Sequence, residues 1–103
     1  MLQILRSLFG NNLKEALRRE GSIVDVRTVH EYDQGRIRGS INIPIERVPS
    51  SLDRIRHMKP PVIFCSNGDS RSANAARYVK QQGIKDVYNG GNWERLLRMK
   101  ENL

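Results

Sequence analysis

Hydrophobic and polar positions along the chain follow two different periods. Short runs rich in β-branched residues predict strands. Stretches with apolar residues three and four positions apart predict helices. The strand runs are residues 22–26, 41–44, 62–64 and 86–88, and the helical stretches are residues 12–19, 50–58, 72–82 and 93–103. Strands that alternate with helices favour a mostly parallel sheet covered on both faces, which is an α/β fold.

Glycine and proline mark the boundaries between these segments. Gly21 ends the first helical stretch and Pro60 ends the second. Residues 30–38, HEYDQGRIR, are polar around a central glycine, so we expect a loop or one helical turn there. Gly90 and Gly91 predict a turn before the last helix.

Length and charge narrow the functional classes. The 103 residues indicate a single domain, residues 1–103, and no apolar run is long enough for a membrane helix. The net charge of +7 is spread along the chain with acids in between, and aromatic residues are only 6%. This pattern fits a surface that attracts small anions or an acidic protein partner better than a nucleic-acid interface. A single cysteine fits a reducing, cytoplasmic location.

That cysteine opens the most informative stretch, CSNGDSRS, residues 65–72. Cys65 directly follows a predicted strand and lies just before a predicted helix, the place where parallel sheets bind ligands. Gly68 permits a strained backbone in the turn, so that successive N–H groups converge on an anion. The helix end and Arg71 add positive charge there.

A thiol in such a field should have a lowered pKa and act as a nucleophile. The alternative is a cysteine buried as a small hydrophobic residue. The seven small or polar residues that follow Cys65 favour the nucleophile.

Three separate segments resemble the rhodanese family. Residues 25–45, DVRTVHEYDQGRIRGSINIPI, resemble its first signature, and the Cys65 loop with Gly68, Arg71 and Ser72 resembles its catalytic loop. Residues 87–93, VYNGGNW, are similar to the segment that closes the fold. The resemblance implies a rhodanese-like three-layer α/β/α domain with a mostly parallel five-stranded sheet.

The resemblance also implies an activity, which is sulfur transfer through a Cys65 persulfide. An anionic donor such as thiosulfate would supply the sulfur, and an external thiol or cyanide would accept it, since the chain has no second cysteine. No metal or organic cofactor is implied. The residues expected to hold the donor and the persulfide are Ser66, Asn67, Gly68, Asp69, Ser70 and Arg71. Asp25, Arg27 and Ser72 are expected to support the site, the first two by tying loops together through hydrogen bonds.

The loop departs from the family pattern by one residue. The usual spacing is Cys-x-x-Gly-x-Arg-Ser, whereas here both Asp69 and Ser70 separate Gly68 from Arg71. The resulting spacing, with five residues between the cysteine and the arginine, is also that of protein phosphatases and arsenate reductases. A phosphatase or arsenate reductase that acts on an oxyanion is therefore the alternative to a sulfurtransferase. Phe64 stands where many phosphatases have histidine, and the sequence identifies no general acid.

A third hypothesis is a non-catalytic interaction module. Trp93 is expected to be a packing anchor.

Overall fold

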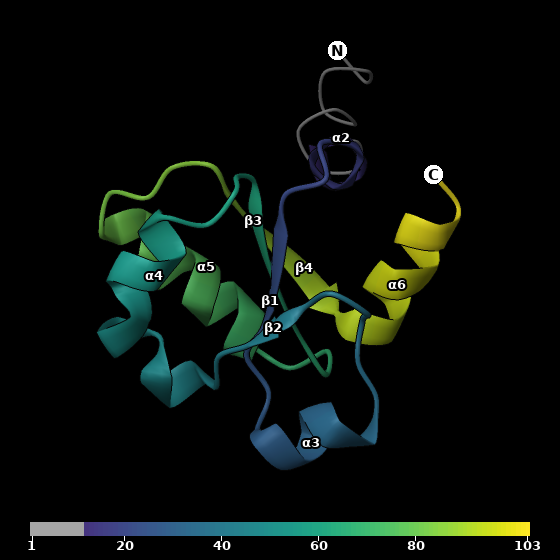
Figure 1. Ribbon diagram of the computed structural model, residues 1–103, viewed down its shortest axis with the longest axis horizontal. Coiled ribbons are helices and arrows are strands. Elements are labelled where there is room, and N and C mark those ends of the chain that lie inside the picture. The colour runs from purple at the N-terminus through teal and green to yellow at the C-terminus, as the bar shows by residue number, and fades with distance from the viewer. Residues whose placement is uncertain (1–11) are drawn as a thin grey trace.

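The central element is one parallel β-sheet. A computed structural model describes residues 12–103, in which four strands pair in the order β2-β1-β3-β4 (Figure 1). The strands are β1 (Ser22–Asp25), β2 (Ile41–Asn42), β3 (Val62–Ser66) and β4 (Val87–Asn92). Their carboxyl ends therefore lie at one edge of the sheet, next to helix α3.

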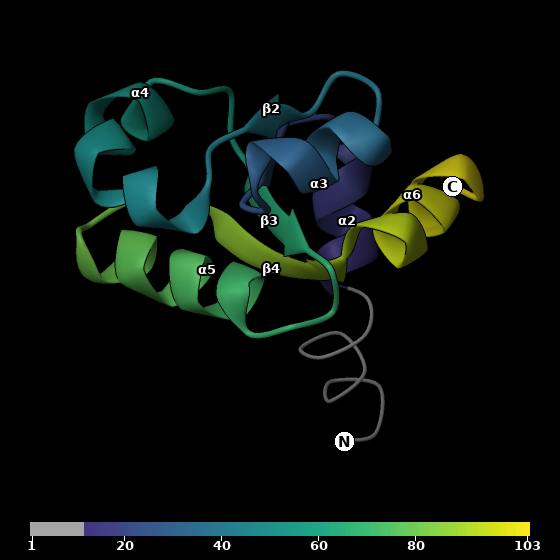
Figure 2. The same cartoon turned by 90° about the horizontal axis from the view of Figure 1, so that it is seen from below.

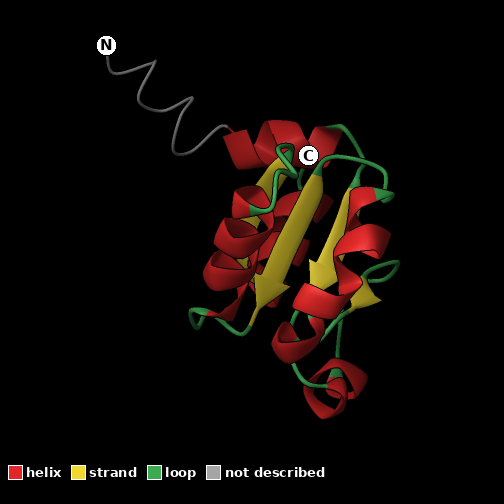
Figure 3. Cartoon of the chain, turned by 90° about the vertical axis from the view of Figure 1, so that its left-hand side faces the viewer, coloured by secondary structure: helices red, strands yellow, loops and turns green. Residues whose placement is uncertain are grey.

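Helices cover the sheet on both faces, which gives three layers (Figures 2 and 3). Helices α2 and α6 pack on one face, and α4 and α5 pack on the other. The helices are α2 (Asn12–Arg18), α3 (Val29–Gln34), α4 (Leu52–Arg56), α5 (Arg71–Gln81) and α6 (Trp93–Glu101), with 3-10 turns at Ile45–Arg47 and Pro49–Ser51. Between residues 12 and 103, no helix combines the length and hydrophobicity needed to cross a membrane.

Alternation along β3 divides the core into two clusters. Val62 and Phe64 face α4 and α5, whereas Ile63 and Cys65 belong to the cluster that α2 and α6 cover. All four are buried because both faces of the strand are packed. The alternation therefore directs the Cys65 side chain away from α5, the helix that follows its loop.

The α/β prediction is confirmed, with two corrections. The family resemblance implied five strands, but the described residues form four, the number that the hydrophobic pattern itself predicts. The expected turn at Gly90 and Gly91 is instead part of β4. The polar stretch 30–38 includes most of a true helix, α3, whose start carries a capping box. Expectations for residues 1–10 fall outside the described residues.

The glycine pair lies inside β4 because the strand passes very close to its neighbours. A Cβ at Gly90 would lie 2.8 Å from Ile63 Cγ2 and 2.9 Å from the Phe64 carbonyl oxygen. Gly91 has a φ of +72° and pairs with Cys65 at an irregularity in the ladder. Glycine is therefore required by close approach at position 90 and by a left-handed backbone at position 91. A left-handed backbone is also common in turns.

A second close approach fixes β1 beside β3 at their starts. The Ser22 N–H donates to the Pro61 carbonyl oxygen at 2.8 Å, and a Cβ at Gly21 would lie 2.0 Å from that oxygen. We expect Gly21→Ala to destabilise the fold by about 1–3 kcal/mol, because backbone must move to admit the methyl group. Urea unfolding monitored by circular dichroism measures this. Lys14→Ala, an exposed change on α2, should stay within about 0.5 kcal/mol, and equal stability of the two variants would contradict the prediction.

Candidate functional site

Cys65 lies at the carboxyl edge of the sheet, one residue before the end of β3. Its register partners are Asp25 on β1 and Gly91 on β4. The side chain is 0% exposed, and the cluster around it includes Ile37 and Leu96. The structure therefore places the thiol below the surface, among apolar side chains.

Burial raises the pKa of the Cys65 thiol well above its usual value, and the negative charge of Asp25 raises it further. Arg27 opposes this shift only in part. The sequence-based prediction of a lowered pKa is therefore wrong for this arrangement. That prediction considered the helix end and the loop amides, and it omitted the loss of solvent around sulfur.

Asp25 and Arg27 form a buried ion pair next to the thiol. Arg27 Nη2 donates to Asp25 Oδ2 at 2.7 Å and Arg27 Nε donates to Asp25 Oδ1 at 2.9 Å. The same guanidinium donates to the carbonyl oxygens of Glu31 at 3.2 Å and Gly35 at 2.7 Å. The pair thus ties the end of β1 to both ends of α3, which are the contacts expected of a structural tie.

The loop after Cys65 satisfies several of its own polar groups. Gly68 has a φ of +83°, which turns the chain back toward α5. The Arg71 N–H donates to Asp69 Oδ1 at 3.0 Å, and the Ser72 N–H donates to Ser66 Oγ at 3.3 Å. The Arg71 amide, one of the donors expected to hold a persulfide, is therefore engaged by a side chain in this arrangement.

Two serines complete the start of α5. Ser70 directly precedes the helix, and its carbonyl oxygen accepts from the Asn74 N–H at 2.9 Å. Ser72 is 1% exposed, and its Oγ has no hydrogen-bond partner among the described residues. Ser72 therefore lies inside the base of the loop, in the position predicted for a supporting residue.

The Arg71 side chain is held by two carboxylates. Its Nη1 donates to Glu31 Oε1 at 2.7 Å, while its Nε and Nη2 donate to Asp69 Oδ1 and Oδ2 at 2.9 and 2.8 Å. These bonds raise the pKa of Arg71, with Asp69 the larger contributor, and lower the pKa of Asp69. They also lower the pKa of Glu31 to about 2. The positive charge of Arg71 is thus compensated before any substrate binds.

Sequence reasoning missed Glu31, which bonds to Arg71 in the loop. Its position carried a signal, since Thr28 and Glu31 form the S/T-x-x-E pattern of a capping box. The Thr28 N–H donates to Glu31 Oε1 at 2.9 Å, and this bond fixes the carboxylate at the start of α3. That the carboxylate also reaches a loop 40 residues away is visible only in the folded chain.

Trp93 closes the site from the start of α6. Its ring centroid lies 4.7 Å from the Arg27 guanidinium carbon, and its Nε1 donates to Asn67 Oδ1 at 3.1 Å. A Cβ at Gly35 would lie 3.1 Å from the ring, so glycine leaves room for it. Trp93 packs against the cluster that contains Cys65, as its predicted role of packing anchor requires.

A shallow depression of about 320 Å³ lies between α3, the loop and the start of α6. Glu31, Asn67, Trp93 and Glu94 are among its lining residues. Arg27, which is 2% exposed, lies at its base. Among residues 12–103, no group of three or more metal-binding side chains is placed to hold an ion.

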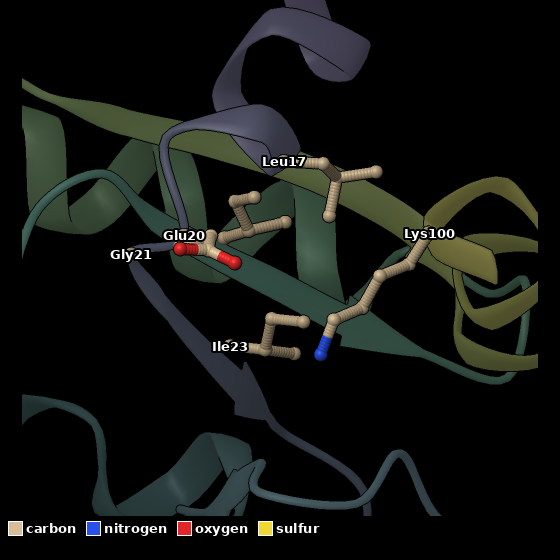
Figure 4. Close-up of a pocket in the computed structure, with 6 residues that line it drawn as sticks. Leu17, Glu20, Gly21, Ile23 and Lys100 are labelled. Carbon is tan, nitrogen blue, oxygen red and sulfur yellow. The ribbon is translucent and has the colours of Figure 1, made fainter. Parts of the chain in front are cut away.

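A second hollow of about 250 Å³ has a different character. Leu17, Ile23 and the aliphatic stem of Lys100 surround it, and Glu20 lies at its edge (Figure 4). It lies near the start of β1, at the opposite end of the strand from Asp25. It therefore has no part in chemistry at Cys65.

Known proteins share both the sequence pattern and the architecture. Residues 10–92 match the rhodanese-like domain. Thiosulfate sulfurtransferase GlpE of Shewanella oneidensis is 36% identical over 66 residues, which are 64% of this chain and 64% of that protein. A sulfurtransferase of Allochromatium vinosum is 36% identical over 67 residues, 65% of this chain and 62% of that protein. The chain thus spans less than two thirds of the length of these relatives.

One solved structure with the same architecture has a different description. It is a protein of unknown function and possible tyrosine phosphatase from Rhodopseudomonas palustris, with a TM-score of 0.66 and 26% identity. The match covers 75% of this chain and 64% of that chain. The family match covers most of the chain and includes both the Asp25–Arg27 pair and the Cys65 loop, so this protein belongs to the rhodanese-like domain family.

Proposed function

We propose that this domain is a sulfurtransferase in which Cys65 carries a sulfur atom as a persulfide. The observation that supports this most directly is the position of Cys65. It is the chain's single cysteine, and it lies where the carboxyl edge of the sheet meets the loop of a rhodanese-like domain. A relative named thiosulfate sulfurtransferase agrees with this assignment.

The proposed reaction consists of two successive nucleophilic displacements at sulfur. The Cys65 thiolate attacks the outer sulfur of thiosulfate, a new S–S bond forms, and the old one breaks with its electron pair leaving on sulfite. A thiol or cyanide acceptor then attacks the terminal sulfur, which restores the Cys65 thiolate and releases a new persulfide or thiocyanate. The protein supplies no second cysteine, so the acceptor comes from solution or from a partner. The chemistry needs no cofactor, and a reducing cytoplasm provides thiol acceptors.

The burial of Cys65 means that catalysis requires local opening. Trp93 packs against the apolar cluster that contains Cys65, and it is held there by its hydrogen bond to Asn67 and its stacking on Arg27. When these contacts open, water and loop amides reach the sulfur, and the cost of charging the thiol falls. Ser66, Asn67, Gly68, Asp69 and Ser70 then supply donors around the persulfide, while Arg71 can bind an anionic donor once one of its carboxylate partners is displaced.

A phosphatase or arsenate reductase is the second candidate, supported by the five-residue spacing from Cys65 to Arg71 and by the solved structure described as a possible tyrosine phosphatase. The pairing of Arg71 with Glu31 and Asp69 opposes it, because a phosphate would have to displace two carboxylates. A non-catalytic module that binds an acidic protein is the third. The full burial and raised pKa of Cys65 are the observations that favour it.

Incubation with thiosulfate distinguishes these functions. We expect intact mass spectrometry to show a gain of one sulfur atom, because thiosulfate is a minimal sulfane donor, and Cys65→Ser should abolish the gain. Hydrolysis of an aryl phosphate without any sulfur adduct would reject sulfur transfer in favour of phosphatase chemistry. The absence of both activities would favour the interaction module.

The raised pKa predicts how the thiol reacts with pH. Since the thiolate is scarce in the closed protein at neutral pH, alkylation of Cys65 by iodoacetamide should accelerate roughly tenfold per pH unit from neutrality to above pH 9. Stopped aliquots analysed by mass spectrometry give the rates. A plateau reached below pH 7 would show that the thiol is already ionised and would contradict the prediction.

The extra loop residue can be tested by deletion. Removing Ser70 restores the usual family spacing between Gly68 and Arg71, so we expect sulfur transfer to be preserved or raised. Thiocyanate formation from thiosulfate and cyanide measures this rate. Ser70→Ala keeps the loop length and serves as the control. A loss of activity on deletion, in a protein that still unfolds cooperatively, would show that the longer loop is required.

A further inference from the structure

The charge around the loop is unusual for a site that receives an anion. Four carboxylates lie at or beside it, those of Asp25, Glu31, Asp69 and Glu94, against the guanidinium groups of Arg27 and Arg71. The chain as a whole carries a charge of +7. Asp25 and Arg27 are buried and paired, so at the surface of the loop and the depression, Glu31, Asp69 and Glu94 lie near Arg71. This local excess of carboxylates disfavours the approach of a free dianion, although the protein as a whole is basic.

Both guanidinium groups are already paired. Arg27 is 2% exposed and bound to Asp25, so it is not available to a ligand from solution. The Arg71 side chain is 25% exposed, and its three nitrogens donate to Glu31 and Asp69. An anionic substrate can use Arg71 only by displacing one of these carboxylates.

Glu31 is the carboxylate that links the loop to another element. Asp69 is two residues from Arg71, whereas Glu31 comes from α3 and also accepts from Asn67 Nδ2 at 3.2 Å. Asn67 in turn accepts from Trp93 Nε1, so Glu31, Asn67 and Trp93 form a chain across the opening. Exchange of Glu31 for a substrate anion would therefore both free Arg71 and loosen the cover over Cys65.

We propose that Glu31 is a specificity-determining residue that competes with anionic substrates for Arg71, and so selects against free oxyanion donors such as thiosulfate. The favoured donors are persulfides, R–S–SH, whose transferable sulfur is not attached to an oxyanion that must compete with Glu31 for Arg71. This inference rests on the proposed sulfur transfer for the identity of the donor. The competition itself concerns any small anionic reagent that reaches Cys65.

The test compares two alkylating reagents that are similar in size and differ in charge. Iodoacetate is an anion and iodoacetamide is neutral, so the ratio of their rates at Cys65 reports the charge selectivity of the opening and cancels the intrinsic reactivity of the thiol. Glu31→Gln removes the charge and keeps a side chain that can complete the capping box, so the start of α3 is retained. The thermal midpoint confirms that the variant is folded.

We expect Glu31→Gln to raise the iodoacetate-to-iodoacetamide ratio by ~3- to 10-fold at low ionic strength, with a smaller effect at high salt. Glu94→Gln is the matched control, because Glu94 lines the same depression but makes no bond to Arg71. It should change the ratio by less than twofold. An unchanged ratio in Glu31→Gln, an equal rise in both variants, or no alkylation of Cys65 by either reagent in any of the proteins would overturn the proposal.

A parallel measurement separates this proposal from the proposed function. Thiosulfate is added to wild type and to Glu31→Gln, and the sulfur gained at Cys65 is followed by mass. A raised alkylation ratio without sulfur uptake by either protein would keep the competition and reject sulfur transfer from thiosulfate. Equal sulfur uptake by both proteins with an unchanged ratio would keep sulfur transfer and reject the competition.

Discussion

The buried pair of Asp25 and Arg27 is the interaction on which the site depends. A carboxylate and a guanidinium that are 0% and 2% exposed are tolerated only when each is fully bonded, and here the Arg27 guanidinium also bonds to carbonyl oxygens at both ends of α3. The pair therefore fixes α3 against the carboxyl edge of the sheet. It also provides the surface on which Trp93 stacks. With that position set, Glu31 meets Arg71 and Trp93 meets Asn67.

The same pair places the negative charge of Asp25 beside a buried thiol. This charge and the burial change the pKa of Cys65 in the same direction. Burial and Asp25 both raise the pKa of Cys65, so the closed structure stores an unreactive thiol. For the proposed persulfide chemistry this arrangement has an advantage, because a protonated, buried sulfur is protected from oxidation.

Much of the architecture followed from the sequence because it depends on local patterns. Four β-branched runs and the apolar spacing of the helices predict the α/β layers, and the structure has them. The error at the glycine pair occurred because one residue type serves two roles. Gly90 and Gly91 indicate a turn, yet in β4 they allow close packing against β3. Residues 30–38 indicated a loop or one helical turn, and the structure has the second, a short helix that starts with a capping box.

By itself, the sequence determined the position of the site: a single cysteine after a buried strand, followed by Gly68 and Arg71, and an Asp25–Arg27 signature far away along the chain. Only the tertiary structure decided the protonation state of Cys65 and the pairing of Arg71. Whether Cys65 is charged depends on how much solvent it retains, and whether Arg71 is free depends on Glu31, which is 40 residues away. Desolvation and ion pairing are properties of neighbours in space, and a linear sequence does not state which neighbours those are.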